Sequence, residues 1–459
     1  MIPAIPVLDK TSATPLYKQL GDALIKKISV GEILPHEKLP PIRVLAASLC
    51  VNNATVVSAY KYLEKNGAIY SVLGSGTFAA KIESASDTRR LDFAESKISA
   101  DCINFLSLAP DPKLFPEDDF RRCFDEILAR EGANAFSFPG VQGYAPLRDI
   151  VCELFYQNIS CDFSPKNIQI TQSANEGLEM LADALISPGD TVIIETPSRP
   201  EAASIFASRG AKILEVALNE SGLDLEKFTF FVKKFKPKIF FLSPNYQIPT
   251  TLCYTQGEKM RVLDLAYNSN AYIIEDDLQG DFFYGEKPTS LLSMDERGRV
   301  IGLKSFDRVL TPGIMGFLAC PDEIINRIRG LGGASGYIQR GLGFYLKNCD
   351  FNAHLEHLRK VYGRKYHKTV SAARQFLGPM LEPDSFKEPG GGLGLWLRAR
   401  GDASGFADEL LARKVLIAPD ELFSGFSRNQ PYFRINFANV TEDEISRGIG
   451  IIASVLKER

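Results

Sequence analysis

The hydrophobic pattern at the start of the chain predicts three helices followed by a hairpin. Apolar residues recur at three- and four-residue steps, at Leu16, Leu20, Ala23, Leu24 and Ile28. This spacing predicts an amphipathic helix over residues 15–30, and the pattern predicts further helices over 41–49 and 53–66. Residues 68–80 alternate in polarity around a Gly-Ser-Gly turn and predict a β-hairpin. This order of elements is typical of a winged helix-turn-helix.

From residue 103 onward, short β-rich runs alternate with helical patterns. The runs are residues 168–172, 191–197, 238–244, 271–277 and 299–303. Helical stretches lie between most of them, for example residues 175–186 and 255–268. This alternation predicts an α/β fold with a mainly parallel sheet covered by helices, and ligands at the carboxyl ends of the strands.

Length and composition indicate a globular protein of two or three domains. The chain has 459 residues, of which 45% are hydrophobic and 24% charged. The polar stretch 81–102 lacks periodicity and is predicted to be a linker, which gives domains at 1–80 and 103–459. No apolar run reaches transmembrane length and the N-terminus lacks the pattern of a signal peptide, so we expect a cytoplasmic protein with no membrane contact.

Cysteine spacing and charge add two constraints. The eight cysteines include no C-x-x-C pair, so we expect reduced thiols and no metal site. His354 and His357 lack a third ligand and are interpreted as a solvated helix face.

Residues 1–82 carry nine basic and five acidic side chains, which gives this part a net charge of +4. Because the whole chain has a net charge of −3, the remainder carries −7. A basic head on an acidic body is weakly indicative of nucleic-acid binding.

Four motifs in the head occur in a fixed order: P-L-Y-K-Q-L at 15–20, L-P-P-I-R-V-L-A at 39–46, T-V-V-S-A-Y-K-Y-L-E at 55–64 and G-S-G-T-F at 74–78. With these motifs the head resembles the GntR-type DNA-binding domain. The resemblance implies that the third helix enters the major groove of double-stranded DNA and that Arg43 and the wing contact phosphates. The implied DNA-binding residues are Arg43, Asn52, Asn53, Thr55, Ser58, Tyr60, Lys61, Ser75 and Thr77.

The head departs from the family pattern at two places. Asn53 stands where the family usually has Arg, and Val72 and Leu73 stand where a basic residue precedes the wing turn. Fewer phosphate contacts should weaken DNA binding and flatten its salt dependence. Asn52 and Asn53 are candidates for reading adenine, although helix capping explains them equally well. A winged helix kept only as an interaction module is the alternative for the head.

Six motifs span the remainder of the chain. They are G-V-Q-G-Y-A-P-L-R at 140–148, I-T-Q-S-A-N-E-G-L at 170–178, S-P-N-Y-Q-I-P-T-T at 243–251, I-I-E-D-D at 273–277, G-L-K-S-F-D-R-V-L-T-P-G-I-M-G-F at 302–317 and P-Y-F-R-I-N-F at 431–437. This region resembles the fold-type I aminotransferases and, most closely, the MocR-like regulators. The resemblance implies a pyridoxal phosphate (PLP)-dependent transferase fold with a small C-terminal α+β subdomain.

The resemblance also implies roles for individual residues. Tyr144 belongs to the substrate-side loop, Ser173 and Ala174 form the phosphate cup, and Ser305 belongs to the segment that anchors the cofactor. Asp276 would pair with the pyridine nitrogen and Arg434 with a substrate carboxylate. A helix cap for Asp276, and an ordinary ion pair for Arg434, are the structural alternatives.

Several of the implied cofactor contacts have been replaced. Arg308 stands where the family places the Schiff-base lysine, and a guanidinium stays protonated and cannot form an aldimine. Lys304 lies four residues earlier. Leu278 replaces a tyrosine, Arg199 an aromatic ring, and Met315 a phosphate-binding arginine. We therefore expect a retained fold without transaminase chemistry, in which PLP binds noncovalently at best.

The resulting hypothesis is a homodimeric MocR-like regulator whose body senses a small anionic molecule, amino-acid-like or phosphate-bearing. Arg199 and Arg308 are candidate ligands for that anion, with exposed surface charges as the alternative reading. Two other hypotheses stay open. One is a PLP enzyme that uses Lys304 or a noncovalent cofactor, and the other is a constitutive DNA binder with a ligand-free body that serves only as a dimerisation scaffold.

Overall fold

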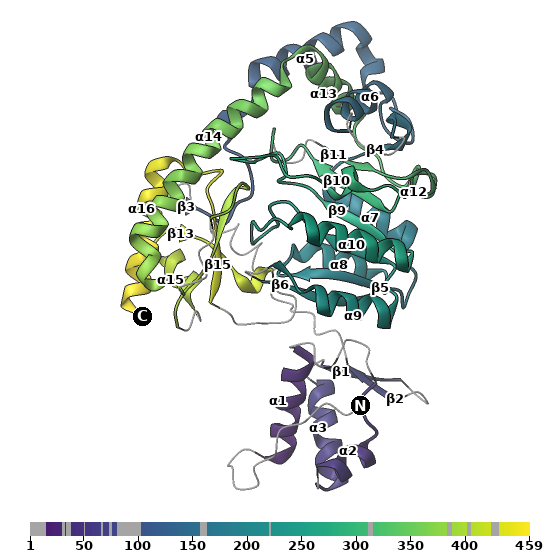
Figure 1. Cartoon of the computed structure of the whole chain (residues 1–459), viewed down its shortest axis with the longest axis vertical. Coiled ribbons are helices and arrows are strands. Elements are labelled where there is room, and N and C mark those ends of the chain that lie inside the picture. Colours follow the sequence, from purple (N-terminus) through teal and green to yellow (C-terminus); the bar gives the residue numbers. More distant parts are fainter. Residues whose placement is uncertain are drawn as a thin grey trace. The chain divides into compact units, whose positions relative to one another are not determined.

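A computed structural model describes the chain in two compact units (Figure 1). One unit contains the first 97 residues and the other contains most of the chain from residue 98 onward. We call them the head and the body and treat each separately. The described residues are 15–29, 33, 38–49, 51–65, 68–72, 76–79, 102–156, 163–219, 222–310, 315–382, 388–401, 405–423 and 431–459.

The head has the predicted order of three helices and a hairpin. Its elements are α1 (Leu16–Ser29), α2 (Ile42–Ser48), α3 (Asn53–Lys65), β1 (Ile69–Val72) and β2 (Gly76–Ala79). The strands pair antiparallel. Leu20, Leu24 and Ile28 of α1 are almost fully buried in one core with Val56 and Leu63 of α3, because their spacing places them on one helix face.

An eight-stranded sheet forms the centre of the body. In spatial order its strands are β4 (Ile168–Thr171), β11 (Gly316–Ala319), β10 (Val300–Ser305), β9 (Tyr272–Asp276), β8 (Ile239–Leu242), β5 (Thr191–Thr196), β6 (Lys212–Asn219) and β7 (Gly222–Leu223). The β10, β9, β8, β5 and β6 strands pair parallel. β11 runs antiparallel to both of its neighbours, and β7 folds back on β6. The prediction of a mainly parallel sheet is confirmed.

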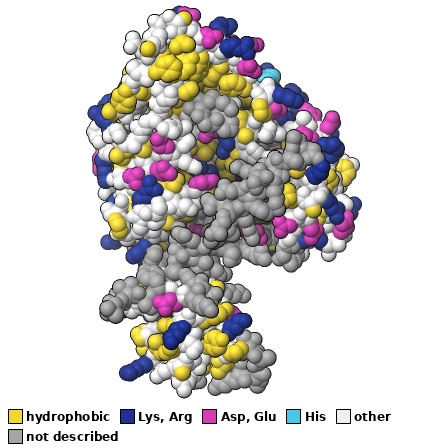
Figure 2. Space-filling model, turned by 180° about the vertical axis from the view of Figure 1, so that it is seen from behind, with side chains coloured by type: hydrophobic (Ala, Val, Ile, Leu, Met, Phe, Trp, Pro, Cys, Tyr) yellow, Lys and Arg dark blue, Asp and Glu magenta, His cyan; other side chains and the backbone are white. Residues whose placement is uncertain are grey.

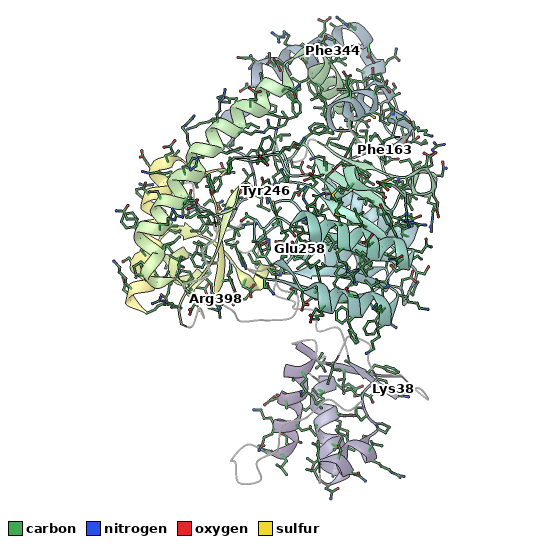
Figure 3. All side chains as sticks on the ribbon, viewed as in Figure 1. Lys38, Phe163, Tyr246, Glu258, Phe344 and Arg398 are labelled. Carbon is green, nitrogen blue, oxygen red and sulfur yellow. The ribbon has the colours of Figure 1, made fainter. Side chains whose placement is uncertain are left out.

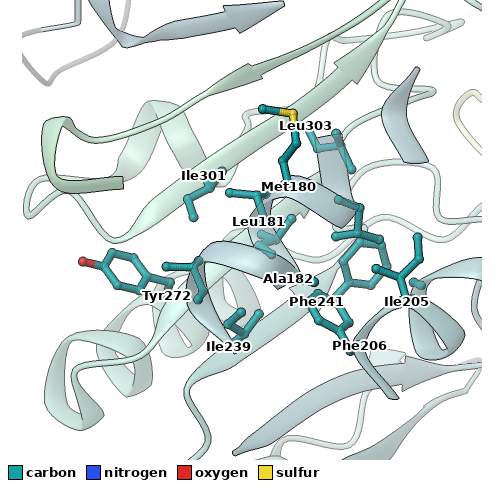
Figure 4. Close-up of a cluster of buried hydrophobic side chains, with 14 of the residues drawn as sticks. Met180, Leu181, Ala182, Ile205, Phe206, Ile239, Phe241, Tyr272, Ile301 and Leu303 are labelled. Atoms are coloured by element: carbon teal, nitrogen blue, oxygen red, sulfur yellow. The ribbon is translucent and has the colours of Figure 1, made fainter. Parts of the chain in front are cut away.

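Helices flank the sheet, and α5, α6 and α13 gather at one end of the body (Figure 1). The helices of this part of the body are α5 (Glu117–Glu131), α6 (Ala145–Tyr156), α7 (Ala174–Leu185), α8 (Pro200–Ser208), α9 (Leu225–Phe235), α10 (Gln256–Ser269), α11 (Leu291–Met294), α12 (Asp322–Ile328) and α13 (Gly336–Asn348). Figure 4 shows apolar side chains of α7 and α8 packed on those of β8, β9 and β10. The strand residues in this core point toward α7 and α8, so the residues that alternate with them point to the other face of the sheet.

The C-terminal part of the body is the smaller α+β layer that the resemblance implied. Its strands are β12 (Gly394–Arg398), β15 (Tyr432–Asn436) and β14 (Ala418–Pro419), with β13 (Val415–Leu416) paired to β3 (Ile103–Asn104). Its helices are α14 (Phe351–Ala372), α15 (Phe406–Ala412) and α16 (Glu442–Glu458). Short 3-10 or π segments are η1 (Pro112–Leu114), η2 (Gly132–Phe136), η3 (Pro165–Asn167), η4 (Ala373–Leu377), η5 (Gly378–Met380) and η6 (Asp420–Leu422).

The described residues contain no group of three or more His, Cys, Asp and Glu side chains arranged to hold a metal ion. No single helix in these stretches is long and apolar enough to span a membrane, although the bent pair α2 and α3 passes that test by length and composition alone.

Candidate functional site

A buried ion pair joins the carboxyl end of β9 to the start of α8. Nε of Arg199 lies 2.8 Å from Oδ2 of Asp276, and both side chains are less than a tenth exposed. Arg199 also donates from Nη1 to Oδ1 of Asn175 on α7, at 3.0 Å. Burial raises the pKa of Asp276, and Arg199 opposes that rise. Of the structural alternatives, Asp276 is thus part of an ion pair rather than a helix cap.

Two further arginines hold the same short piece of backbone. Arg308, which follows β10, donates from Nη1 to the carbonyl of Leu108 at 2.9 Å. Arg434, on β15, donates from Nη2 to the carbonyl of Leu106 at 2.9 Å. Oδ1 of Asn104 accepts the backbone N–H groups of Leu106 and of the residue after it, so the turn is fixed from its other side as well.

The three arginines keep buried N–H groups that have no hydrogen-bond partner among the described residues. These atoms are Nη2 of Arg199, Nε of Arg308, and Nε and Nη1 of Arg434. One buried acceptor, Oδ1 of Asp276, is also without a partner. Burial, together with the neighbouring Arg308 charge, lowers the pKa of Arg434 to about 9. Burial likewise lowers the pKa of Arg308, and the Arg199 charge adds to that effect.

Unpartnered buried donors are unusual, because each one costs free energy when it leaves water without gaining a bond. We call Arg199, Arg308 and Arg434 the arginine cluster. Among the described residues, only one carboxylate, that of Asp276, is bonded to these three positive charges, so the cluster has an excess of positive charge. Chemically, such a cluster suits a ligand with two negative charges or several acceptor oxygens.

The other residues implied for the cofactor site have local structural partners. Oγ of Ser173 accepts from Glu176 N at 3.1 Å and caps α7, and Ala174 follows it in the first turn, 4% exposed. Oγ of Ser305 accepts the N–H of Asp307 at 2.9 Å. The N–H of Tyr144 donates to Oε1 of Gln339 at 2.6 Å, and its ring lies under a guanidinium.

Lys304 points to the opposite face of the sheet from Asp276. Leu303 of β10 packs in the core under α7 and α8, so the next residue, Lys304, faces the other way. Its Nζ lies 2.7 Å from Oδ2 of Asp277 and 3.0 Å from Oδ2 of Asp281. Burial disfavours its charge, but these two carboxylates outweigh burial and raise the pKa of Lys304.

Two of the positions at which the resemblance implied a cofactor contact hold core residues. Leu278 is 9% exposed and belongs to the core beneath α7 and α8. Met315 is fully buried just before β11, where its carbonyl accepts the N–H of Phe306 at 2.9 Å. Both positions therefore contribute apolar packing in this chain.

The arrangement does not fit covalently held PLP. Arg308 carries no amine that could form an imine, and Lys304 is held by two carboxylates across the sheet. Asp276, the carboxylate expected to meet a pyridine nitrogen, is already hydrogen-bonded to Arg199. The unpartnered guanidinium N–H groups could still receive the phosphate of a noncovalently bound molecule.

In the head, most of the predicted DNA-binding residues lie on the surface. Arg43, Asn52, Asn53, Ser58 and Lys61 are exposed, and Thr55 and Thr77 are half-buried. Oδ1 of Asn52 accepts the N–H of Ala54 at 3.0 Å, which is a capping bond at the start of α3. Ser75 lies outside the described residues.

Tyr60 was wrongly included among the DNA-facing residues. It is 7% exposed, and its hydroxyl donates to the carbonyl of Pro40 at 2.7 Å, so it belongs to the core of the head. Lys38 (Figure 3) was not predicted to belong to this surface; it forms an isolated β-bridge with Phe78 of the wing, and its side chain lies beside Gly76. Lys38 is distant from the wing in sequence, so no local pattern signalled this contact.

The interpretation of the two histidines was correct only in part. His357 is exposed, but His354 is half-buried, and its Nε2 lies 2.7 Å from the carbonyl of Val309. Burial lowers the pKa of His354. This contact places α14 against the residue that follows Arg308.

Comparison with known proteins gives the class of each unit. Residues 114–452 match the family "Aminotransferase class I and II", and residues 16–79 match "Bacterial regulatory proteins, gntR family". The chain is 25% identical over 403 residues to a probable rhizopine catabolism regulatory protein, MocR, of Rhizobium meliloti, covering 82% of this chain and 81% of that one. It is 26% identical over 469 residues to an uncharacterized HTH-type transcriptional regulator, YdcR, of Escherichia coli, covering 96% and 99%.

A solved structure matches the body. The alpha-aminoadipate aminotransferase LysN of Thermus thermophilus, crystallised with N-(5'-phosphopyridoxyl)-L-leucine, superposes with a TM-score of 0.73 at 25% identity and covers 82% of this chain and 95% of that one. The chain therefore belongs to the class I and II aminotransferase family. Its GntR head makes it a DNA-binding transcription regulator of the MocR/GntR type.

Proposed function

We propose that this regulator binds a small dianion in its aminotransferase-like body and does not catalyse transamination. The observation that carries the proposal is the arginine cluster, in which four buried guanidinium nitrogens have no hydrogen-bond partner in the described stretches. An anion would supply the missing acceptors in a site shielded from water, where charge-assisted hydrogen bonds are strong. A phosphate monoester or a dicarboxylate has the required charge.

The proposed loss of catalysis rests on the chemistry of three residues. Arg308 occupies the position at which the family motif places the reactive lysine, Lys304 lies across the sheet, and Asp276 is paired with Arg199. PLP is in this proposal a noncovalent ligand at best, and no reaction step depends on it.

The two carbonyl contacts suggest how an anion would be sensed. Arg308 and Arg434 donate to the carbonyls of Leu108 and Leu106, neutral acceptors that a dianion would outcompete. In the sequence, the residues before β3 connect the body to the head. An anion that drew these guanidinium groups away from residues 106–108 would thus change the anchoring of the segment that tethers the head. This effect requires different ligand affinities for the two states.

A homodimer is part of the proposal. Hydrophobic side chains gather at the end of the body where α5, α6 and α13 lie (Figure 2). Large apolar residues there are strongly exposed, including Phe136 at 62% and Phe138 at 71%. Exposed apolar patches of this kind mark protein interfaces, and a second copy of the body is the proposed partner.

One set of measurements tests the proposal. We expect a footprint on the DNA upstream of the protein's own coding sequence that changes with the anion, and a rise in Tm with inorganic phosphate or succinate. After incubation with PLP and borohydride reduction, we expect no added mass and no transamination with an amino-acid panel. A pyridoxyl adduct on Lys304 would instead support the enzyme, and absence of specific protection would argue against the regulator. A footprint with no Tm response to any anion would support the ligand-free scaffold.

A further inference from the structure

Two cysteines distant in sequence meet where α5 packs against the end of α13. Cys123 lies on α5, and Cys349 follows the last residue of α13 as its C-cap. Their sulfur atoms are 3.7 Å apart although 226 positions separate them in the sequence. This is a van der Waals contact between two thiols, so a modest side-chain rotation could bring the sulfurs to bonding distance.

The two thiols differ in access and in electrostatic surroundings. Cys123 is 1% exposed, and burial raises its pKa to about 12. Cys349 is half-buried, and Nη2 of Arg122 lies 3.8 Å from its sulfur. An oxidant must reach a sulfur atom before it can react with it. Cys349 is therefore the better placed of the two to react first, with Cys123 directly beside it.

We propose that Cys123 and Cys349 are an oxidation site at which a hydroperoxide converts the pair to an intramolecular disulfide. The Cys349 thiolate attacks a peroxide oxygen, the O–O bond breaks, and the leaving oxygen takes up a proton. The product at Cys349 is a sulfenic acid. Cys123 then loses its proton to solvent and attacks the Cys349 sulfur, which expels hydroxide. Two thiols are oxidised and one peroxide is reduced.

The location gives the modification a structural consequence. A disulfide would link α5 covalently to the junction between α13 and α14. His354, which contacts the carbonyl of Val309, lies one helical turn further along α14. The bond would thus restrain the helix that packs against the residue following Arg308.

The test uses the full-length protein treated with hydrogen peroxide, then alkylated and digested with trypsin without reduction. The relevant peptides are residues 123–130 and 348–359, which trypsin releases separately and which carry one cysteine each. We expect them to appear as one linked species, lighter by two hydrogen atoms than their sum, which dithiothreitol separates. Recovery of peroxide-treated Cys349 as sulfinic or sulfonic acid, with Cys123 alkylated, would overturn the proposal.

Three variants complete the test. Cys123→Ser and Cys349→Ser should each abolish the linked species, whereas Cys253→Ser removes an exposed cysteine elsewhere in the body and should leave it unchanged. Because the wild-type peptide map requires no substitution, the proposal stays testable if a variant folds poorly. A non-reducing gel distinguishes an intramolecular from an intermolecular disulfide. The expected bond lies within one chain, so the protein should migrate as a monomer, and a disulfide-linked dimer would count against the proposal.

Discussion

At the scale of single residues, the most unusual feature is positive charge buried without full compensation. Arg434 is 3% exposed, and two of its nitrogens, Nε and Nη1, have no hydrogen-bond partner in the part of the chain that the structure describes. Its remaining hydrogen bond goes to a neutral carbonyl. A buried charge with incomplete pairing destabilises a fold, so selection for packing alone would favour an apolar side chain at this position. A ligand that completes the pairing accounts for the arginine.

The substitution Arg434→Met should therefore stabilise the ligand-free protein and abolish its response to anions. Methionine keeps similar volume and removes the buried charge, so we expect a gain on the order of 1–3 kcal/mol in the free energy of unfolding. The rise in Tm with inorganic phosphate should disappear. Arg413→Met is the matched control, because Arg413 forms an exposed ion pair with Glu458 and its loss should leave stability almost unchanged. A destabilised Arg434→Met protein that still responds to phosphate would contradict the expectation.

Glu195 gives a prediction for pH. It is 1% exposed at the centre of the sheet, bonded to Ser243 N and to the hydroxyl of Tyr254. Burial raises the pKa of Glu195 from 4.5 to about 7. Between those values the folded protein binds more protons than the unfolded chain, so the stability contributed by this group falls as pH rises.

Glu195→Gln removes that titration. Relative to wild type, the variant should gain stability between pH 5 and pH 8, by on the order of 1–3 kcal/mol, in unfolding measured at several pH values. Glu226→Gln on the exposed start of α9 controls for the change in net charge. A difference between Glu195→Gln and wild type that is constant across this range would show that Glu195 does not titrate there.

At the scale of elements, alternation along β9 separates two polar regions. Asp276 faces α8 and binds Arg199, whereas Asp277 faces the other side and binds Lys304. Lys304 is on β10 and faces away from Asp276, whereas Arg308 lies in the turn after β10. The ion pairs of Lys304 with Asp277 and Asp281 hold its amine on its own side of the sheet, so closeness in sequence to Arg308 does not bring it to the arginine cluster.

The helix α3 shows the same division between core and surface. Tyr60→Phe removes a buried hydrogen bond to Pro40 and should cost the head about 1 kcal/mol while leaving the salt dependence of DNA binding unchanged. Lys61→Ala, at the adjacent exposed position, should weaken binding to all sequences and lower the slope of log affinity against log salt by about 1. Titrations at several salt concentrations compare the two. The assignment fails if Tyr60→Phe alters the slope and Lys61→Ala does not.

At the scale of the whole molecule, the exposed apolar surface near α5 and α13 predicts the oligomeric state. Phe138→Asp places a charge in the proposed interface and should shift the protein from dimer toward monomer, as measured by light scattering across a concentration series. Phe230→Asp is the matched control, because this phenylalanine is 53% exposed on α9, away from the patch. If both variants stay dimeric, or if both dissociate, the surface around Phe138 is not the interface.

At this scale, local periodicity in the sequence predicted most of the architecture. The helices of the head, the strands of the body and the parallel sheet followed from periodicity, because burial of one face imposes a local pattern on each element. Arg199, Arg308 and Arg434 were named as candidates, and the structure brings hydrogen-bonding partners to each of them. Tyr60 was misassigned because a residue on a DNA-reading helix can equally face its core, and a motif does not state which way a side chain points.

The sequence by itself determined the elements and their order, and it gave rise to the interpretation that Arg308 stands at the position of the family's lysine. Only the tertiary structure decided which charges meet. Arg308 and Arg434 reach carbonyls 200 and 328 positions away, and Cys123 reaches Cys349 across 226. Every residue has a backbone carbonyl, so no pattern of side chains in the sequence indicates that those of Leu106 and Leu108 accept hydrogen bonds from the arginines. Such contacts depend on how the sheet and helices close around one another, which local periodicity does not encode.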